Sequence, residues 1–354
     1  MESQDPMKTM KPPIEPKISV LIPAMRGYHS VLAAVEAWEG QTRRDALEIL
    51  VLAPDSEGAD RLPPGQRVVE TGDLTLHQMR AAGVRAATAD HVMIAEDHCF
   101  PDPNWSEIML PRLDEGWDGM GGALCSGDPS SAAVQAPFLL GYGQWILPET
   151  GPTHILPGHN AIWRKDLLLD LGEALPTELL IMTFFVQRMH KSGKRIFVES
   201  EALMRHFDPT GMLEELRIMT CGGLGFGAIR TQDWNPLLKL LYLGAAPLIG
   251  GLHWKRTLRE HLRTRGASGL NDLSLLHAIP LALAWGCGES LGAIMGIQGA
   301  AKHTWRSEIK PPTRERVAAA MQAVGLAGNA EAGDRPSMRH GVDDVVGTDA
   351  HSQR

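Results

Sequence analysis

The apolar positions in the first half of the chain form short continuous runs separated by amphipathic stretches. The runs at residues 17–23, 47–52 and 68–70 predict buried strands, the first two closed by Pro. The amphipathic stretch 76–87 predicts a helix. Strands that alternate with helices indicate a doubly wound, mostly parallel α/β sheet, in which ligands gather at the carboxyl ends of the strands.

A helix is also expected directly after the first strand. Val31, Ala34, Val35 and Trp38 have the spacing of one apolar helix face. Ser30 precedes them and is expected to cap the helix with its hydroxyl group.

The middle of the chain has a weaker pattern. Residues 119–158 are rich in Gly, Pro and Ser, which favours a long loop with short strands lying over the site. Residues 164–171 and 178–191 predict helices, and residues 195–198 predict another strand that leads towards His206.

Beyond Asp208 the chain becomes strongly apolar. Residues 236–251 carry one charge, Lys239, and residues 273–301 carry one formal charge, Glu289. A membrane-spanning helix needs about 20 apolar residues, but Pro and several Gly interrupt the second segment. One interpretation is interfacial or re-entrant helices whose basic residues face anionic lipid. The other is a buried helical pair that packs on the preceding domain. The basic residues are Lys255, Arg256, Arg259, Arg263 and Arg265.

Composition narrows the class of protein. The chain has 354 residues, 44% of them hydrophobic, so a packed core is expected. The net charge of -8 and the absence of a basic stripe argue against a nucleic-acid partner. Four cysteines without CxxC spacing favour reduced thiols in the cytoplasm. We expect a flexible N-terminus (1–16), an α/β domain (17–210), a helical, membrane-associated region (211–324) and a disordered tail (325–354).

Three residues with ligating side chains follow the apolar run that begins at His91. Glu96 and Asp97 offer oxygen ligands, and His98 offers an imidazole that suits manganese or another transition metal. A divalent ion at a strand end can neutralise phosphate groups. The alternative is a strand that runs into a solvated acidic turn.

Several blocks of the chain, in order, resemble glycosyltransferase family 2, whose members have the GT-A fold. The resemblance runs from about Ile18 to His206. Its blocks are Ile18-Ser19-Val20-Leu21-Ile22-Pro23, Gln41-Thr42, Glu48-Ile49-Leu50-Val51, Arg80-Ala81-Ala82-Gly83, Gly158-His159-Asn160-Ala161 and Gly193-Lys194-Arg195-Ile196.

The resemblance implies transfer of a sugar from a nucleotide-diphosphate donor, with a UDP-sugar as the favoured type, to an acceptor hydroxyl. In this family an Asp-x-Asp motif holds Mn²⁺ or Mg²⁺. Glu96 and His98 occupy its first and third positions, and His206 lies where the fold often places a further metal ligand. A structural histidine near a strand end is the alternative for His206.

The resemblance also implies the donor site and the acceptor side of the catalytic centre. Pro23, Asp55, Arg80 and Asp97 would contact the nucleotide sugar. Asp55 is also a candidate for a turn of the Asx type, and Arg80 for a surface helix charge. The acceptor-side loop contains Gly158 and Asn160.

The catalytic base departs from the family pattern. Inverting members place a carboxylate where this chain has Ile181-Met182-Thr183. Glu178 is the nearest candidate to take the proton from the acceptor hydroxyl. Its alternative role is that of an acid near a helix N-terminus, favoured by the helix dipole.

Three functions follow from these patterns. The first is a metal-dependent, inverting hexosyltransferase on the cytosolic face of a membrane, peripheral or re-entrant, that acts on a glycan or lipid-linked acceptor for cell-envelope biogenesis. The second is a non-catalytic GT-A protein that binds a nucleotide sugar or acts as a scaffold. The third, another nucleotide-diphosphate enzyme, lacks support because no Gly-rich phosphate loop with a following Lys lies near the first strand.

Overall fold

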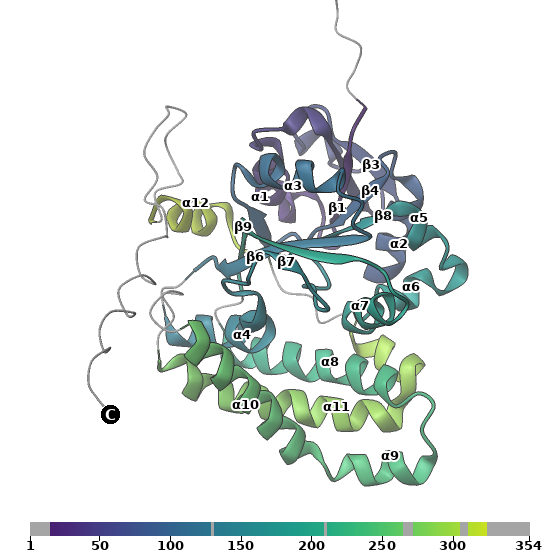
Figure 1. The fold of residues 1–354 in the computed structure, drawn as a ribbon, viewed down its shortest axis with the longest axis vertical. Coiled ribbons are helices and arrows are strands. Elements are labelled where there is room, and N and C mark those ends of the chain that lie inside the picture. Colours follow the sequence, from purple (N-terminus) through teal and green to yellow (C-terminus); the bar gives the residue numbers. More distant parts are fainter. Residues whose placement is uncertain (1–14, 129–130, 209–210, 265–271, 305–310, 324–354) are drawn as a thin grey trace, which may run out of the picture.

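A computed structural model of the chain describes residues 15–128, 131–208, 211–264, 272–304 and 311–323 (Figure 1). Both ends of the chain lie outside the described residues. The expected flexible N-terminus, up to residue 14, and the expected tail from residue 325 are therefore not described.

Within these residues nine strands form one mixed sheet in the order β3-β2-β1-β4-β8-β6-β9-β5, and β7 pairs with β9. Strands β3, β2, β1 and β4 are joined by parallel pairs, as are β6 and β9, whereas β8 is antiparallel to both β4 and β6. The strands are β1 Ile18–Pro23, β2 Leu47–Ala53, β3 Arg67–Glu70, β4 His91–Ile94, β5 Cys99–Pro101, β6 Gly119–Ser126, β7 Gly151–Pro152, β8 Ala161–Arg164 and β9 Ile196–His206.

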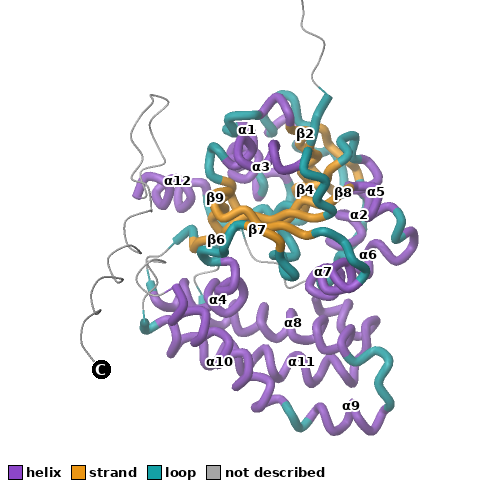
Figure 2. Tube along the Cα trace, viewed as in Figure 1, coloured by secondary structure: helices purple, strands orange, loops and turns teal. Residues whose placement is uncertain are grey.

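Helices cover both faces of this sheet and form a separate layer on one side of it (Figures 1 and 2). The helices of the sheet domain are α1 Leu32–Glu39, α2 Leu76–Ala86, α3 Trp105–Leu113, α4 Ala132–Tyr142, α5 Lys165–Leu169, α6 Leu175–Glu178 and α7 Met182–Lys191. The later helices are α8 Met212–Arg230, α9 Pro236–Leu243, α10 Ala246–Thr264, α11 Ser274–Thr304 and α12 Arg314–Ala323. This mixed, mostly parallel sheet with flanking helices and a helical C-terminal part confirms the predicted α/β fold class.

The two faces of the sheet have separate hydrophobic cores. Val20 and Ile49 pack with Trp38 in the core on the side of α1 and α3. Leu21 and Leu50, their neighbours in sequence, pack in the core on the side of α2 and α7. Because both faces are buried, β1 and β2 read as continuous apolar runs rather than as alternating ones.

The expectation of a loop at residues 119–158 was wrong for its first part, since β6 is a central strand. Its glycines are required by neighbouring groups. A Cβ atom at Gly119 would overlap the ring of Trp163, and one at Gly122 would overlap the Ala202 carbonyl. Glycine is common in loops and depleted in strands, so composition indicated a loop where close packing dictated the residue.

Two helix boundaries also differ from the prediction. Ser30 belongs to a short 3₁₀ turn and its hydroxyl donates to the carbonyl of Gly27, so it does not cap α1. The helix expected at residues 178–191 starts at Met182 instead, and Glu178 ends the short helix α6.

Close backbone approach joins α8 to α11 in the helical part. Gly223 and Gly227 of α8 face Trp285 and Glu289 of α11 so closely that a Cβ atom on either glycine would meet backbone atoms. Small residues permit this approach, which is common between apolar helices.

A single buried carboxylate connects four helices of this part. Glu289 of α11 is fully buried and lies 2.5 Å from the Tyr242 hydroxyl oxygen, 3.0 Å from Nη1 of Arg230 and 3.0 Å from Nε1 of Trp285. His253 of α10 approaches it at 3.4 Å. The ion pair and hydrogen bonds offset the cost of burying the charge and fix α8, α9 and α10 against α11.

The outer face of the helical part is apolar. Among the described helices, Ser274–His303 is long and apolar enough to cross a membrane, and 50% of its most apolar window is buried inside the protein. Helices α9 and α10 together also meet this criterion, but they are bent by 67° at their junction. The exposed residues include Leu237, Leu240, Leu241, Leu248 and Leu252.

Helix α12 lies apart from these helices. It packs near α1 on the sheet domain (Figure 1). Arg314 of α12 pairs with Glu36 of α1.

The contact between α8 and α11 can be tested by adding one methyl group. Gly227→Ala should lower the free energy of unfolding by about 1–3 kcal/mol, because the new Cβ forces the two backbones apart. Gly251→Ala is the matched control on α10, where a Cβ meets nothing within 4 Å. That change should be neutral or stabilising by up to about 1 kcal/mol. Denaturant unfolding measures both variants, and equal stability of the two would contradict the packing described here.

Candidate metal centre

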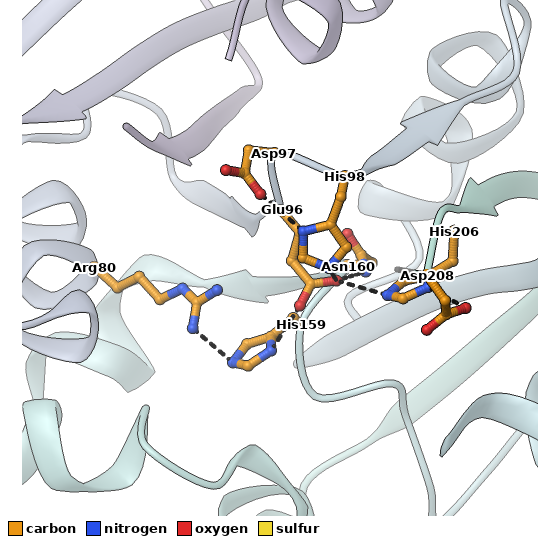
Figure 3. A network of polar contacts seen from close by, with 8 residues as sticks. All are labelled: Arg80, Glu96, Asp97, His98, His159, Asn160, His206 and Asp208. Carbon is orange, nitrogen blue, oxygen red and sulfur yellow. Dashed lines mark hydrogen bonds and ion pairs between the residues drawn. The ribbon is translucent and has the colours of Figure 1, made fainter. Parts of the chain in front are cut away.

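Three ligating side chains meet at the carboxyl end of β4. Glu96 and His98 follow that strand, and His206 ends β9, where it is aligned with Cys99 of β5. One ligand atom from each residue can be chosen so that all three lie within 4.8 Å of one another. Nε2 of His98 and Nε2 of His206 each lie 3.8 Å from Oε2 of Glu96 (Figure 3). All three side chains are buried.

Each imidazole is held by its own carboxylate. Nδ1 of His98 lies 2.8 Å from the Asp97 carboxylate, and Nδ1 of His206 lies 3.1 Å from the Asp208 carboxylate. When Nδ1 donates to a carboxylate, the lone pair of a neutral imidazole is on Nε2, the nitrogen that faces Glu96. Carboxylate–histidine pairs of this kind orient the ligands of many metal sites.

The donor set fits a divalent transition metal. Nε2 of His206 is buried and has no hydrogen-bond partner among the residues that the structure describes. An orphaned buried nitrogen beside a carboxylate oxygen is costly unless a cation or a donor is shared between them. Two imidazoles and one carboxylate suit Mn²⁺ and its neighbours better than Mg²⁺, which prefers oxygen ligands.

The Glu96 carboxylate also connects β4 to the loop before β8. Its Oε2 accepts a hydrogen bond from Nδ2 of Asn160 at 2.7 Å, and its Oε1 lies 3.1 Å from Nδ1 of His159. Burial alone would raise the pKa of Glu96, but the proximity of His98, the hydrogen bond with His159 and the proximity of His206 hold that pKa well below its usual range. The ligand is therefore a carboxylate at neutral pH.

Asn160 reaches Glu96 through an uncommon backbone conformation. Its φ is 63°, in the left-handed region, and its N–H donates to the Ile94 carbonyl at 2.6 Å. Asn tolerates this region better than most residues, and strained backbone of this kind is concentrated at functional sites. Asn160 of the predicted acceptor-side loop is thus placed against Glu96 of the candidate metal centre.

Arg80 extends the network away from the cluster. Its Nη1 lies 2.8 Å from Nε2 of His159 (Figure 3). Because arginine can only donate, Nε2 of His159 accepts and Nδ1 donates to Glu96. Burial and the charge of Arg80 lower the pKa of His159, which keeps the ring neutral. Nε of Arg80 is buried without a hydrogen-bond partner among the described residues.

The other residues that are predicted to contact the nucleotide sugar lie in three different settings. Asp97 holds His98, as described above. Pro23 is buried at the end of β1. Asp55 is exposed after β2, and its Oδ1 accepts from the Glu57 N–H at 2.9 Å, which is the geometry of an Asx turn.

The predicted catalytic base is engaged elsewhere. Glu178 at the end of α6 forms an ion pair with Arg188 of α7. The family position of the base falls at the start of α7, where the Met182 side chain packs against Gly158 so closely that a Cβ on this glycine would overlap it. The structure therefore places an apolar side chain against the predicted acceptor-side loop.

Four further residues of the site were not identified from the sequence. His159 and Asp208 hold metal-ligand candidates, and Tyr142 of α4 places its ring 4.3 Å from that of His206. The His-x-Asp spacing of residues 206 and 208 was an available signal for one of them. Glu215, the fourth, comes from α8 of the helical part, for which the sequence offered no signal.

Glu215 of α8 is a buried acid. It is 2% exposed, and neither carboxylate oxygen has a hydrogen-bond partner within the described residues. Burial, with the charges of Asp208 and Glu214, raises the pKa of Glu215 to about 9. In the absence of a cation the side chain is protonated at neutral pH.

Comparisons with known proteins give a likeness in fold. No family model matches the chain, and neither does any curated protein. Among solved structures, the chain is similar to a mannosyltransferase from Pyrobaculum calidifontis in complex with GDP-mannose and Mn²⁺, with 17% identity and a TM-score of 0.43 over 86% of this chain and 92% of that one. It is also similar to a mycobacterial protein, with 18% identity and a TM-score of 0.37 over 56% of this chain and 70% of that one. At these values the likeness assigns no role to any residue of this chain.

Glu215 makes a prediction about the pH dependence of stability. The unfolded chain loses this proton near pH 4.5 and the folded protein near pH 9. Its contribution to stability is therefore complete below pH 4.5 and is lost as the pH rises through 9. Thermal unfolding is measured in EDTA, so that no cation is bound. The difference between the Tm of Glu215→Gln and that of the wild type should increase in favour of the variant from pH 5 to pH 8. Glu173→Gln, at an exposed position, is the control with no such trend. A constant difference for Glu215→Gln would contradict the assignment.

Proposed function

We propose that this protein is a metal-dependent glycosyltransferase that moves a sugar from a nucleotide-diphosphate donor to an acceptor hydroxyl. The observation that carries the proposal is the convergence of Glu96, His98 and His206 at the carboxyl end of β4, with an acidic partner behind each imidazole. In open α/β sheets this edge is where ligands bind.

The residues of the centre have separate tasks in this proposal. Glu96, His98 and His206 would hold Mn²⁺. Once bound, the ion would neutralise charge on the departing diphosphate. Arg80 is buried against His159, and its Nε has no hydrogen-bond partner among the described residues. A guanidinium is suited to bidentate contact with a phosphate group.

The acceptor hydroxyl must lose its proton as it attacks the anomeric carbon. We assign this step to Glu178, the acid closest in sequence to the family position. The assignment requires that substrate binding release Glu178 from Arg188, because the carboxylate is ion-paired in this structure.

The finer identity of the enzyme follows from the sequence resemblance. We propose a member of family 2 with an inverting mechanism and a UDP-sugar donor. The two imidazoles favour Mn²⁺ over Mg²⁺ as its metal ion. The acceptor is a glycan or a lipid-linked saccharide used in cell-envelope synthesis.

A second candidate function is a GT-A protein that binds a nucleotide sugar without transferring it. Met182 at the family position of the base and the ion pair of Glu178 favour this alternative. It shares the metal centre with the first function and differs only in turnover.

We further propose that the helical part contacts the cytosolic face of a membrane. Leu237, Leu240 and Leu241 of α9 are 65%, 61% and 65% exposed. Leu248 and Leu252 continue this surface on α10. We call these five leucines the leucine surface. Exposed apolar area of this kind next to Lys239, with Lys255 exposed on α10, suits an interface with anionic lipid.

Metal and donor binding test the main proposal. Calorimetric titration with Mn²⁺ and a panel of UDP-, GDP- and dTDP-sugars should give binding of one donor that requires Mn²⁺. His206→Ala should weaken Mn²⁺ binding by at least the 10–100-fold that is typical of outer-shell changes. His190→Ala, an exposed histidine on α7, is the control and should bind like the wild type. Mn²⁺-dependent donor binding that persists in Glu96→Ala with His98→Ala would remove the proposed centre.

Turnover separates the two candidate functions. If the protein is a transferase, Glu178→Gln should abolish donor hydrolysis and sugar transfer while Mn²⁺-dependent donor binding remains. Glu173→Gln should retain activity, because this residue is exposed and lies outside the site. Binding of a donor without any turnover by the wild type would favour the non-catalytic alternative.

Membrane contact is tested by sedimentation with vesicles of phosphatidylglycerol and phosphatidylcholine. The full-length protein should sediment with them, and Leu240→Glu with Leu241→Glu should stay largely in the supernatant, because two charges cannot enter the interface. Leu213→Glu changes another leucine, 83% exposed at the start of α8, and should sediment like the wild type. Full-length protein that remains soluble with every vesicle would exclude the contact.

A further inference from the structure

One arginine from near the C-terminus reaches the edge of the metal centre. Nη1 of Arg316, on α12, donates to the Asp208 carbonyl at 3.0 Å. Its Nε donates to Oδ2 of Asp128 at 2.8 Å, and its Nη2 lies 2.7 Å from the same oxygen. The guanidinium carbon lies 5.7 Å from the centre of the Phe207 ring. The side chain is thus held by a carboxylate, a carbonyl and an aromatic ring.

These contacts join the ends of two adjacent strands. Asp128 follows β6 and Asp208 follows β9, and these strands pair in parallel up to His206. Two backbone hydrogen bonds extend the pairing of β9 beside the site, the first with β6 and the second with the segment before β5. The Gly127 N–H donates to the His206 carbonyl at 2.7 Å, and the Phe207 N–H donates to the His98 carbonyl at 2.9 Å.

A short chain of contacts therefore connects α12 to a candidate metal ligand. Arg316 fixes the backbone of Asp208, and the Asp208 carboxylate holds Nδ1 of His206 at 3.1 Å. The orientation of the His206 ring depends on that carboxylate, so it depends in turn on where the segment after β9 lies.

We propose that Arg316 is a positioning residue of the metal centre, and that α12 is a strap that holds the segment His206-Phe207-Asp208 in its ligating geometry. This inference rests on the proposed metal centre. It assigns to the last described helix a role in the site that is independent of the helical part, since α12 packs on the sheet domain.

The chemistry of the side chain supports a positioning role over a simple surface ion pair. The Arg316 and Asp128 side chains are 23% and 16% exposed, so solvent screens their pairing only in part. The planar guanidinium binds two strand ends at once, with donors in a fixed geometry that the ammonium of lysine does not provide. The neighbouring Arg314 lacks this arrangement, because its partner Glu36 is on α1 and both side chains are about half exposed.

The experiment compares Mn²⁺ binding by wild type, Arg316→Ala, Arg316→Lys and Arg314→Ala in the full chain. Arg316→Ala should weaken Mn²⁺ binding by about 10-fold, the lower end for outer-shell changes. Arg316→Lys keeps one contact and should lie between wild type and Arg316→Ala. Arg314→Ala removes a charge from the same helix and should bind Mn²⁺ like the wild type.

Hydrogen exchange provides a readout that needs no metal. In Arg316→Ala, peptides that contain the amides of Gly127 and Phe207 should exchange faster than in the wild type, whereas Arg314→Ala should leave them unchanged. This result separates a loosened strand end from a general loss of stability, which would also affect β1 and β2.

The outcomes distinguish the two proposals. Wild-type protein that binds no Mn²⁺ would overturn the metal centre, and the role of Arg316 in it would be lost as well. Mn²⁺ binding that is equal in wild type and Arg316→Ala, with unchanged exchange at Gly127 and Phe207, would overturn the strap alone. If Arg316→Ala does not fold, Arg316→Lys and Asp128→Asn carry the same test, since each removes part of the contact.

Discussion

The charge on the Glu96 carboxylate organises the edge of the sheet where the candidate site lies. It faces two imidazoles on one side, those of His98 and His206, and the Asn160 amide and His159 on the other. A buried carboxylate is unfavourable without such partners, and the partners in turn gain their fixed positions from it. The contacts of this one carboxylate therefore hold together β4, the loop before β8 and the end of β9.

The site draws on parts of the chain that are far apart in sequence. The strand ends provide Glu96, His98 and His206, α8 provides the buried acid Glu215, and α12 provides Arg316, which contacts the Asp208 carbonyl. The helices after residue 211 thus contribute polar side chains as well as an apolar surface. A description of the chain as a catalytic domain followed by an anchor would leave out both contributions.

The sequence was sufficient for the parts of the fold that are governed by burial on both faces. Strands β1 and β2 appeared as continuous apolar runs, and the alternation with helices indicated the parallel order. It was insufficient for β6, because distant residues leave no room for a side chain at its glycines. Gly119 lies against Trp163, 44 residues away, and Gly122 lies against Ala202, 80 residues away. Packing between distant residues leaves no local pattern to read.

The same reasoning applies to the site. The cluster of Glu96 and His98 was visible because both residues follow one apolar strand, and His206 was placed by the order of the family blocks. Arg316 was not visible, because it acts on Asp208 across 108 residues and a lone arginine on a polar helix resembles any surface charge. Whether Glu178 could approach a substrate also depends on its pairing with Arg188, which spacing alone does not show.

The buried contacts of Glu289 have a consequence for how the protein would meet a lipid surface. Because this carboxylate ties α8, α9 and α10 to α11, the leucine surface cannot move independently of the helices that pack beneath the sheet. If α9 touches a membrane, the packing of these helices would therefore fix the height and tilt of the candidate metal centre above it. On a lipid-linked acceptor, the protein would then act on the hydroxyl whose distance from the bilayer matches this fixed height.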